Sequence, residues 1–289
     1  MKELDLEYKI FGEGKDMLVI ETGIGGSFYD WYPIIEEIKE YFTVIVYHRA
    51  GYGKSNSQIT PRTTRNIAKE LNCLVEEIGL KDKFILMGHS FGGLCVQQYA
   101  KMYPNKLKGI ILIDSTSINY KQLYMLDIPV MCSLIQIDQM IENNSNTSKK
   151  SKEDLKDQNK NMVLQYKNHI PNIEMTDVED FFSNPNLYKT TADEFQNWEI
   201  NSKDIRSITN FPNIPLIAIA RDNKVSEDSW VKYNIPVHEA VQYENEWRKL
   251  QIELSTLSGK GQLIIAENSD HEIYLDRPDI IIQCLKTLL

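Results

Sequence analysis

Cysteine is scarce in this sequence, and its few thiols are not paired. The four cysteines are widely spaced, and none of them forms a CxxC pair: Cys73, Cys95, Cys132 and Cys284. Closely spaced cysteines are typical of zinc sites, and disulfide frameworks belong to small, cysteine-dense secreted chains. The sequence therefore predicts neither a metal site nor a disulfide framework, and we expect the cysteines to be core thiols.

Long apolar runs and basic clusters are also missing. The sequence has no run of roughly 18 apolar residues, which a membrane-spanning helix needs. The first seven residues interleave acids with leucines, unlike the apolar core of a signal peptide. The formal net charge is −9, whereas binding to nucleic acid needs clustered Lys and Arg. We expect a cytoplasmic protein with no membrane span and no nucleic-acid partner; the oligomeric state stays open.

The 289 residues, 42% of them hydrophobic, are enough for one large domain. Strand-like and helical patterns alternate along the chain, which predicts a mostly parallel α/β sheet of about eight strands with helices on both sides. A further run, 4–11, ends in a turn at 12–16 and predicts an antiparallel edge hairpin. Strand-like runs occupy 17–20, 43–47, 84–87, 109–113, 215–219 and 262–266, and helical patterns occupy 33–38, 63–78, 91–103, 239–257 and 279–289.

The alternation breaks between about residues 115 and 210. This stretch is too long for a simple crossover, so it should fold into a structure of its own. We expect 1–114 and 211–289 to form the core and 115–210 to form a helical cap or lid. Within this stretch, residues 143–161 are rich in Asn, Ser and Lys. They should be mobile or form an exposed helix.

A serine between two glycines directly follows the apolar run 84–87. The pentapeptide Gly88-His89-Ser90-Phe91-Gly92 has the pattern of a nucleophile elbow, a tight turn from strand to helix that exposes the central hydroxyl. Glycines two positions before and after the serine remove Cβ atoms that would collide across such a bend. The helix that follows directs its positive N-terminal end toward Ser90.

Together with three other segments, this elbow resembles the α/β-hydrolase superfamily, in particular its single-domain enzymes with a helical cap. The other segments are Glu21-Thr22-Gly23-Ile24-Gly25-Gly26, the run 48–55, and Asn268-Ser269-Asp270-His271. The likeness spans nearly the whole chain outside the expected cap. It implies an α/β-hydrolase fold and a catalytic triad whose members occur in the order Ser, acid, His.

The resemblance makes Ser90 the nucleophile and His271 its base. A neutral hydroxyl needs a base to accept its proton, and imidazole has a suitable pKa. His271 comes last in the chain, as the order requires. The other histidines compete less well, because His89 should face away from the nucleophile, His48 ends another strand, and His169 and His238 lie in or near variable segments.

Two carboxylates compete for the place of the triad acid. Asp114 stands at the end of the strand 109–113, a position that the superfamily uses. Asp222 follows the strand 215–219, nearer the commoner position, which lies close to Lys224 in this chain. Asp222 comes two residues too early, so we favour Asp114. The alternative for Asp114 is a structural aspartate that caps a turn.

The resemblance also implies an oxyanion hole of two backbone amides, from Phe91 and Ile24. Gly23, Gly25 and Gly26 would let the backbone around Ile24 approach the substrate. Many relatives carry His-Gly where this chain has Thr22-Gly23. The change removes a side-chain brace but no amide.

These residues predict a serine hydrolase that cleaves a small carboxylic ester through an acyl-enzyme, without metal or organic cofactor. Its partner is then a small-molecule acyl substrate. Dehalogenase and epoxide-hydrolase chemistry is disfavoured, because those relatives use Asp in place of Ser90. One alternative is a proline-iminopeptidase-like aminopeptidase, which needs acids to hold an amino group; candidates are Glu174, Asp177, Glu179 and Asp180. Another is a non-catalytic ligand-binding homologue.

Overall fold

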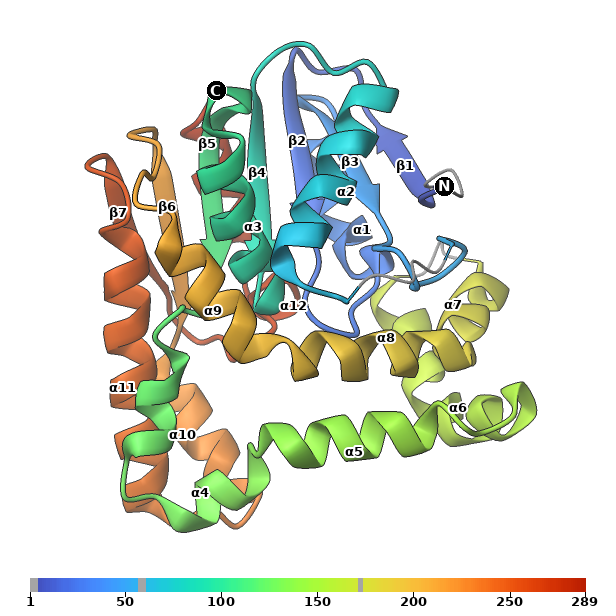
Figure 1. The fold of residues 1–289 in the computed structure, drawn as a ribbon, viewed down its shortest axis with the longest axis vertical. Coiled ribbons are helices and arrows are strands. Elements are labelled where there is room, and N and C mark those ends of the chain that lie inside the picture. Colours follow the sequence, from blue (N-terminus) through green and yellow to red (C-terminus); the bar gives the residue numbers. More distant parts are fainter. Residues whose placement is uncertain (1–4, 57–60, 171–173) are drawn as a thin grey trace.

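A single sheet of seven strands organises the described part of the chain (Figure 1). The computed structural model describes residues 5–56, 61–170 and 174–289. The strand order is β1-β3-β2-β4-β5-β6-β7, and every pairing except β1 with β3 is parallel. The mostly parallel α/β sheet is thus confirmed. The strands are β1 (Tyr8–Phe11), β2 (Asp16–Glu21), β3 (Phe42–Tyr47), β4 (Phe84–His89), β5 (Leu107–Ile113), β6 (Leu216–Arg221) and β7 (Gly261–Ala266).

The first strand is antiparallel and lies at the edge, but it does not form the expected hairpin. β1 pairs with β3 rather than with the β2 strand that follows it. The reason is that β2 already lies between β3 and β4 and pairs with both of them in parallel. β2 therefore has no free edge, and β1 pairs with the outer edge of β3 instead. Leu4, the first residue of the predicted run, lies outside the described residues.

Side chains alternate between two hydrophobic clusters, one on each face of the sheet. Along β2, for example, Leu18 and Ile20 belong to one cluster and Val19 to the other, because successive strand residues point to opposite faces. The first face is covered by α1 (Tyr32–Ile38) and α13 (Pro278–Lys286), and the second by α2 (Thr64–Glu77), α3 (Phe91–Met102) and α11 (Val237–Ser255). The core is a three-layer α/β/α structure.

The stretch between β5 and β6 folds into helices, together with the 3₁₀ turn at Tyr120–Met125. In Figure 1 these helices lie at the end of the sheet toward which β5 points. Residues 143–161 form the end of α5 and the start of α6 and are mostly exposed, as one of the two expectations had it. The helices are α4 (Pro129–Leu134), α5 (Ile137–Thr147), α6 (Lys152–His169), α7 (Met175–Phe182), α8 (Pro185–Gln196) and α9 (Trp198–Ser207).

Two further short helices follow β6 and β7. α10 (Asn223–Lys232) follows β6 directly and packs on α11, and α12 (Ile273–Asp276) precedes α13. None of the helices in the described part of the chain is long and apolar enough to cross a bilayer.

Candidate active site

Ser90 occupies the tight turn between β4 and α3. Its φ of 53° and ψ of −123° are strained for a residue with a side chain. Its N–H donates to the carbonyl of Ile113 on β5, at 3.1 Å. A Cβ on Gly88 would lie 2.6 Å from a methyl of Val96, and one on Gly92 would lie 2.4 Å from two backbone carbonyl oxygens. Only glycine fits at these two positions, so the sequence motif serves to build this bend.

His271 and Asp114 are joined across the ends of two strands. His271 lies in the loop between β7 and α12, and Asp114 follows β5 with a positive φ of 38°. Nδ1 of His271 lies 2.6 Å from Oδ2 of Asp114. An ionised carboxylate only accepts hydrogen bonds, so Nδ1 carries the proton. In the neutral imidazole, the other ring nitrogen, Nε2, then has a lone pair that can accept a proton.

Asp114 is fully buried and surrounded by donors. Its Oδ1 accepts from the indole Nε1 of Trp247 at 2.8 Å and from the backbone N–H of Arg221 at 3.4 Å. Its Oδ2 also accepts from Nη1 of Arg221 at 3.0 Å. Burial would raise the pKa of Asp114, but the charge of Arg221 and the hydrogen bonds from His271 and Trp247 hold it well below its usual range. Asp114 is therefore ionised.

Arg221 is in turn held by a second buried acid, Glu244 of α11. Nε and Nη2 of Arg221 donate to the two carboxylate oxygens of Glu244 at 3.0 and 2.6 Å. The guanidinium also lies 4.6 Å from the ring centroid of Trp247, a cation–π distance. Burial opposes its charge, but Asp114 and Glu244 raise the pKa of Arg221 well above its usual value. Arg221, Glu244 and Trp247 form a charged cluster behind the His271–Asp114 pair that sequence reasoning missed.

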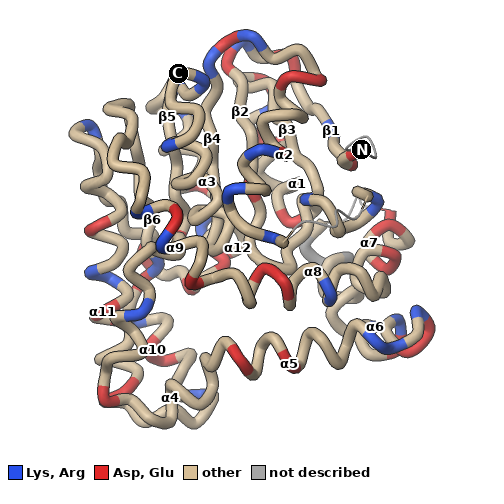
Figure 2. Tube along the Cα trace, in the orientation of Figure 1, with Lys and Arg blue, Asp and Glu red and all other residues tan. Residues whose placement is uncertain are grey.

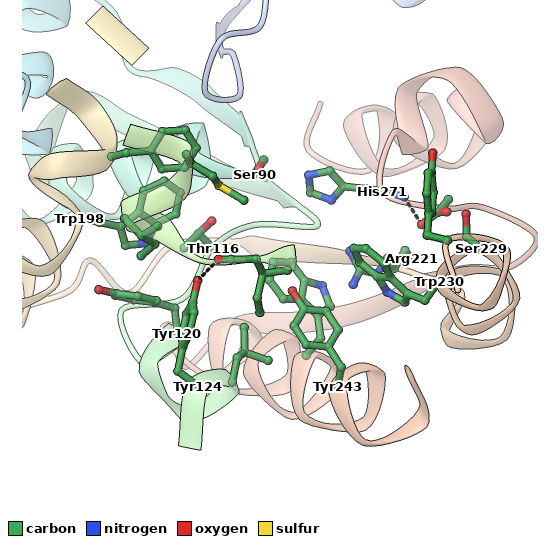
Figure 3. A pocket seen from close by; sticks show the side chains of 18 of the residues that line it. Ser90, Thr116, Tyr120, Tyr124, Trp198, Arg221, Ser229, Trp230, Tyr243 and His271 are labelled. Carbon is green, nitrogen blue, oxygen red and sulfur yellow. Dashed lines mark hydrogen bonds between the residues drawn. The ribbon is translucent and has the colours of Figure 1, made fainter. Parts of the chain in front are cut away.

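Ser90 and His271 line the same cavity, which has a volume of about 530 Å³. In Figure 3 the hydroxyl of Ser90 and the ring of His271 face each other across its upper part. No hydrogen bond joins the two side chains in the described structure; such bonds often tighten only when substrate binds. The fold thus brings together two groups that are 181 positions apart in the sequence, 90 and 271.

The other described histidines lie in different surroundings. Nε2 of His89 donates to the backbone carbonyl of His271 at 3.0 Å. Burial and the neighbouring His271 lower the pKa of His89 to about 3, so it stays neutral and supports the loop of His271. His48 lies in a separate pocket, 2.7 Å from Glu7 and 2.9 Å from Ser27.

Two histidines remain. His238 is exposed on α11. The side chain of His169, at the end of α6, lies outside the described part of the chain.

Asp222, the rival acid, caps a helix. Its Oδ1 accepts from the backbone N–H of Lys224 at 2.9 Å, which makes Asp222 the N-cap of α10. Its Oδ2 accepts from the backbone N–H of Asn268 at 3.0 Å. A turn-capping role was the alternative to catalysis for Asp114. In the structure, it is Asp222 that makes such contacts.

The amide of Phe91 and the loop that carries Ile24 lie next to Ser90. Phe91 is the first residue of α3, so its N–H has no partner within the helix. A Cβ on Gly23 would lie 3.5 Å from the Cβ of Ser90, which places the loop of Ile24 against the nucleophile. The side chains of Ile24 and Phe91 pack in one hydrophobic cluster.

Buried Arg49 holds the loop that carries Ile24. It donates to the carbonyls of Thr22 and Gly23 at 2.7 and 2.9 Å and forms ion pairs with Glu21 and with Glu194 of α8. Arg49 thus braces this loop where many relatives have a histidine in place of Thr22. Its role became visible only in the fold, because Glu194 is distant in sequence.

Aromatic side chains form a large part of the cavity wall, and they come from helices α8 to α11, from the C-cap of α10 and from the 3₁₀ turn. Leucine, isoleucine and methionine side chains complete the apolar part. The aromatic residues are Tyr120, Tyr124, Phe195, Trp198, Trp230, Tyr233, Tyr243 and Trp247.

The acids considered for binding a substrate amine do not line this cavity. Asp177, Glu179 and Asp180 lie on α7 and form ion pairs with lysines, and Glu174 precedes that helix. Figure 2 shows acidic and basic residues mixed around α6 and α7.

Comparison with known proteins identifies the family. A family model described as the alpha/beta hydrolase fold matches residues 16–253. "Putative carbamate hydrolase RutD" of Azorhizobium caulinodans is 30% identical over 112 residues, 39% of this chain, and the match spans only 42% of that relative. The proline iminopeptidase of Saccharolobus solfataricus is 24% identical, and the alignment covers 98% of this chain and 87% of that protein.

Solved structures agree with this result at the level of the fold. The enol-lactonase from Burkholderia xenovorans LB400 superimposes with a TM-score of 0.65 at 16% identity, covering 99% of this chain and 96% of that one. The resemblance seen in the sequence is thus confirmed: the chain belongs to the α/β-hydrolase fold family.

Proposed function

We propose that this hydrolase-family chain is a serine hydrolase that cleaves a small carboxylic ester through an acyl-enzyme. One observation carries the proposal. A serine at a strained elbow shares a cavity with a histidine whose Nδ1 is bound by a buried, ionised aspartate. This combination of nucleophile, base and orienting acid is the arrangement that activates a hydroxyl.

The reaction follows from these positions. Oγ of Ser90 attacks the ester carbonyl carbon, and its proton passes to Nε2 of His271. Asp114 holds the tautomer of His271 and stabilises the imidazolium that forms. When the tetrahedral intermediate collapses, His271 gives the proton to the departing alcohol, which leaves an acyl group on Ser90. Water then attacks this acyl group with His271 again as the base. The bond between the acyl carbon and Oγ of Ser90 breaks, His271 returns the proton to Oγ, and the carboxylic acid leaves.

The backbone amides of Phe91 and Ile24 stabilise the oxyanion in both steps. Loss of one such donor typically costs about 3 kcal/mol of transition-state stabilisation. Arg49 fixes the loop of Ile24 through its hydrogen bonds to the carbonyls of Thr22 and Gly23. No step requires a metal ion or an organic cofactor.

The helices of residues 115–210 act as the cap of this site. With the loop after β5, they supply Thr116, Tyr120, Phe195 and Trp198 to the cavity that contains Ser90. The core supplies the reacting groups and the cap supplies much of the substrate pocket, so the chain divides functionally into 1–114 with 211–289 and 115–210.

An aminopeptidase like the proline iminopeptidase remains the second candidate, because that relative aligns with 98% of this chain. The ester is favoured, because the acids weighed for the amine do not line the cavity and those of α7 are paired with lysines. Asp270 and Glu272 do line it, so the prolyl substrate tests whether they hold an amine instead. A comparison of p-nitrophenyl butyrate with prolyl p-nitroanilide decides between the two candidates. The ester proposal predicts that only the butyrate is turned over.

Covalent labelling tests whether the chain is a catalyst. A fluorophosphonate probe should label the wild-type protein and fail to label Ser90→Ala, and the same variant should lose ester hydrolysis. Ser117→Ala serves as a control, because this buried serine follows β5 without lining the cavity. A wild-type protein that neither reacts with the probe nor hydrolyses esters would instead support a ligand-binding homologue.

A further inference from the structure

The cavity has two aromatic walls, one beside the nucleophile and one beside the base. On the Ser90 side, Phe195 and Trp198 stack with ring centroids 5.2 Å apart and an angle of 10° between the ring planes. Trp198 also lies 5.1 Å from the ring of Phe91 and 6.0 Å from that of Tyr120. This wall therefore adjoins the residue whose amide is the proposed oxyanion donor.

The second wall adjoins His271. The ring of Trp247 lies 6.3 Å from that of His271, Tyr243 lies 6.3 Å from Trp247, and Trp230 lies 5.7 Å from Tyr243. In Figure 3, Ser90 and His271 lie between Trp198 on one side and Trp230 on the other. The indole N–H groups of Trp247 and Trp230 are bound by Asp114 and Glu244.

The two walls correspond to the two halves of an ester. The carbonyl carbon must meet Ser90, and the acyl group and the alcohol extend from it in opposite directions, so the acyl group lies on the Trp198 side when the alcohol lies against His271. His271 must reach the oxygen of the departing alcohol to protonate it, so the alcohol lies on the Trp230 side. Each half of the substrate therefore meets an aromatic wall.

The charges around the cavity are unfavourable for anions. Arg221 is the only cationic side chain among the described lining residues, and Asp114 and Glu244 already neutralise it. Arg248 lies near this cluster but donates to the carbonyl of Arg221 and lines a different pocket.

Two carboxylates line the same cavity. Burial would raise the pKa of Asp270, but hydrogen bonds from Ser226 and Ser229 outweigh it and lower the pKa below its usual value. Glu272 is exposed at the cavity and forms no ion pair with a described residue. A substrate carboxylate would meet these negative charges without a free cation to balance it.

We infer that this site takes esters with an aromatic or large apolar group on each side of the scissile bond and rejects esters that carry a carboxylate. The inference rests on the proposed function, because it assumes that Ser90 and His271 react. It names the substrate class for that same site.

A matched set of p-nitrophenyl esters tests the charge preference, because the leaving group stays constant. We expect kcat/KM for p-nitrophenyl pentanoate to exceed that for the p-nitrophenyl monoester of glutaric acid by at least about 100-fold, since like charges brought together cost several kcal/mol. Glu272→Gln should reduce this ratio by about tenfold. An equal rate for the two esters would overturn the inference.

Ratios within one variant test the two walls. Trp198→Ala should lower the ratio of kcat/KM for p-nitrophenyl phenylacetate to kcat/KM for p-nitrophenyl acetate by about tenfold. It should leave the ratio of kcat/KM for benzyl acetate to kcat/KM for ethyl acetate unchanged. Trp230→Ala should have the opposite pattern. Ile200→Ala, an exposed position on α9 outside the cavity, should change neither ratio. If each tryptophan variant lowers both ratios equally, the assignment of the walls is wrong.

The proposed function and this inference fail in different ways. Ser90-dependent hydrolysis that accepts both charged and uncharged esters would overturn the substrate class and leave the serine hydrolase intact. A protein that hydrolyses no ester and shows no fluorophosphonate labelling would overturn both.

Discussion

Replacing Asp114 by Asn tests the role of the triad acid at one atom. Every described contact of this carboxylate comes from a donor: Nδ1 of His271, Nη1 of Arg221, Nε1 of Trp247 and the backbone N–H of Arg221. An amide has one accepting oxygen and one donating NH₂ group. In either orientation, the NH₂ group of the substituted side chain therefore faces a donor.

The two orientations have different consequences. With its NH₂ toward Nδ1, the amide favours the tautomer of His271 that carries its proton on Nε2, which cannot accept the proton of Ser90. With its NH₂ toward Trp247, it keeps the tautomer but opposes two donors. The first orientation is favoured. It opposes one fixed donor, Nη1 of Arg221, because Nδ1 of His271 can lose its proton and become an acceptor. The variant should therefore hold the wrong tautomer.

The expected loss in kcat/KM is about 10⁴-fold, or about 5.5 kcal/mol of transition-state stabilisation. The assay is the initial rate on p-nitrophenyl butyrate, with circular dichroism to verify folding. Asp222→Asn is the matched control. Asn is as good an N-cap as Asp, so this variant should keep activity within about threefold. It should lose about 1 kcal/mol of stability, because its NH₂ group replaces the oxygen that accepts from the N–H of Asn268. A folded Asp114→Asn enzyme within tenfold of wild type would refute the reasoning, as would an inactive Asp222→Asn enzyme.

Three further substitutions have defined outcomes. Glu244→Gln leaves the buried charge of Arg221 with a single acid and should lower the free energy of unfolding by about 3–5 kcal/mol; Glu246→Gln on the same helix, whose partner is a mostly exposed lysine, should cost under about 1 kcal/mol. Denaturant titration of both variants measures the difference, and equal losses would contradict it. Burial raises the pKa of Asp30 from 3.8 to about 6, so the stability from its protonated form is fully present below about pH 4 and lost as the pH rises through 6. Asp30→Asn should therefore be more stable than wild type at pH 8 by up to about 3 kcal/mol and about equal near pH 4; no gain at pH 8 would show that the carboxylate ionises freely in the fold. Gly92→Ala would put a Cβ 2.4 Å from carbonyl oxygens at the end of β2. It should lower the free energy of unfolding, measured by thermal denaturation, by about 1–3 kcal/mol and remove most of the esterase rate. An unchanged stability and rate would mean that the bend tolerates a side chain.

The fold could be predicted from the sequence because its strands are short, continuous apolar runs. Runs such as 84–87 and 109–113 are buried on both faces, and helices between them leave a parallel sheet as the consistent arrangement. The partner of β1 could not be predicted, because local alternation does not say which edge of the sheet is free. α10 was missed because its sequence, Asn223–Lys232, is mostly polar and has little amphipathic pattern.

The candidate site could be predicted only where residues follow a local motif. Ser90 directly follows β4 and His271 lies in the loop after β7, and the structure brings both to one cavity. Arg221 and Glu244 have no such signal, because their pairing depends on how α11 packs beside β6. The residues of the cavity walls could not be predicted for the same reason, because the order of the helices in 115–210 does not reveal which side chains face Ser90.

The central claim is that Ser90 becomes acylated during turnover, and peptide mass spectrometry tests it most directly. The protein is mixed with p-nitrophenyl butyrate, quenched in acid within milliseconds and digested. The account predicts a butyryl adduct on the peptide that contains Ser90, and neither adduct nor turnover in Ser90→Ala. Turnover by Ser90→Ala at the wild-type rate, or an adduct on a different residue, would contradict it.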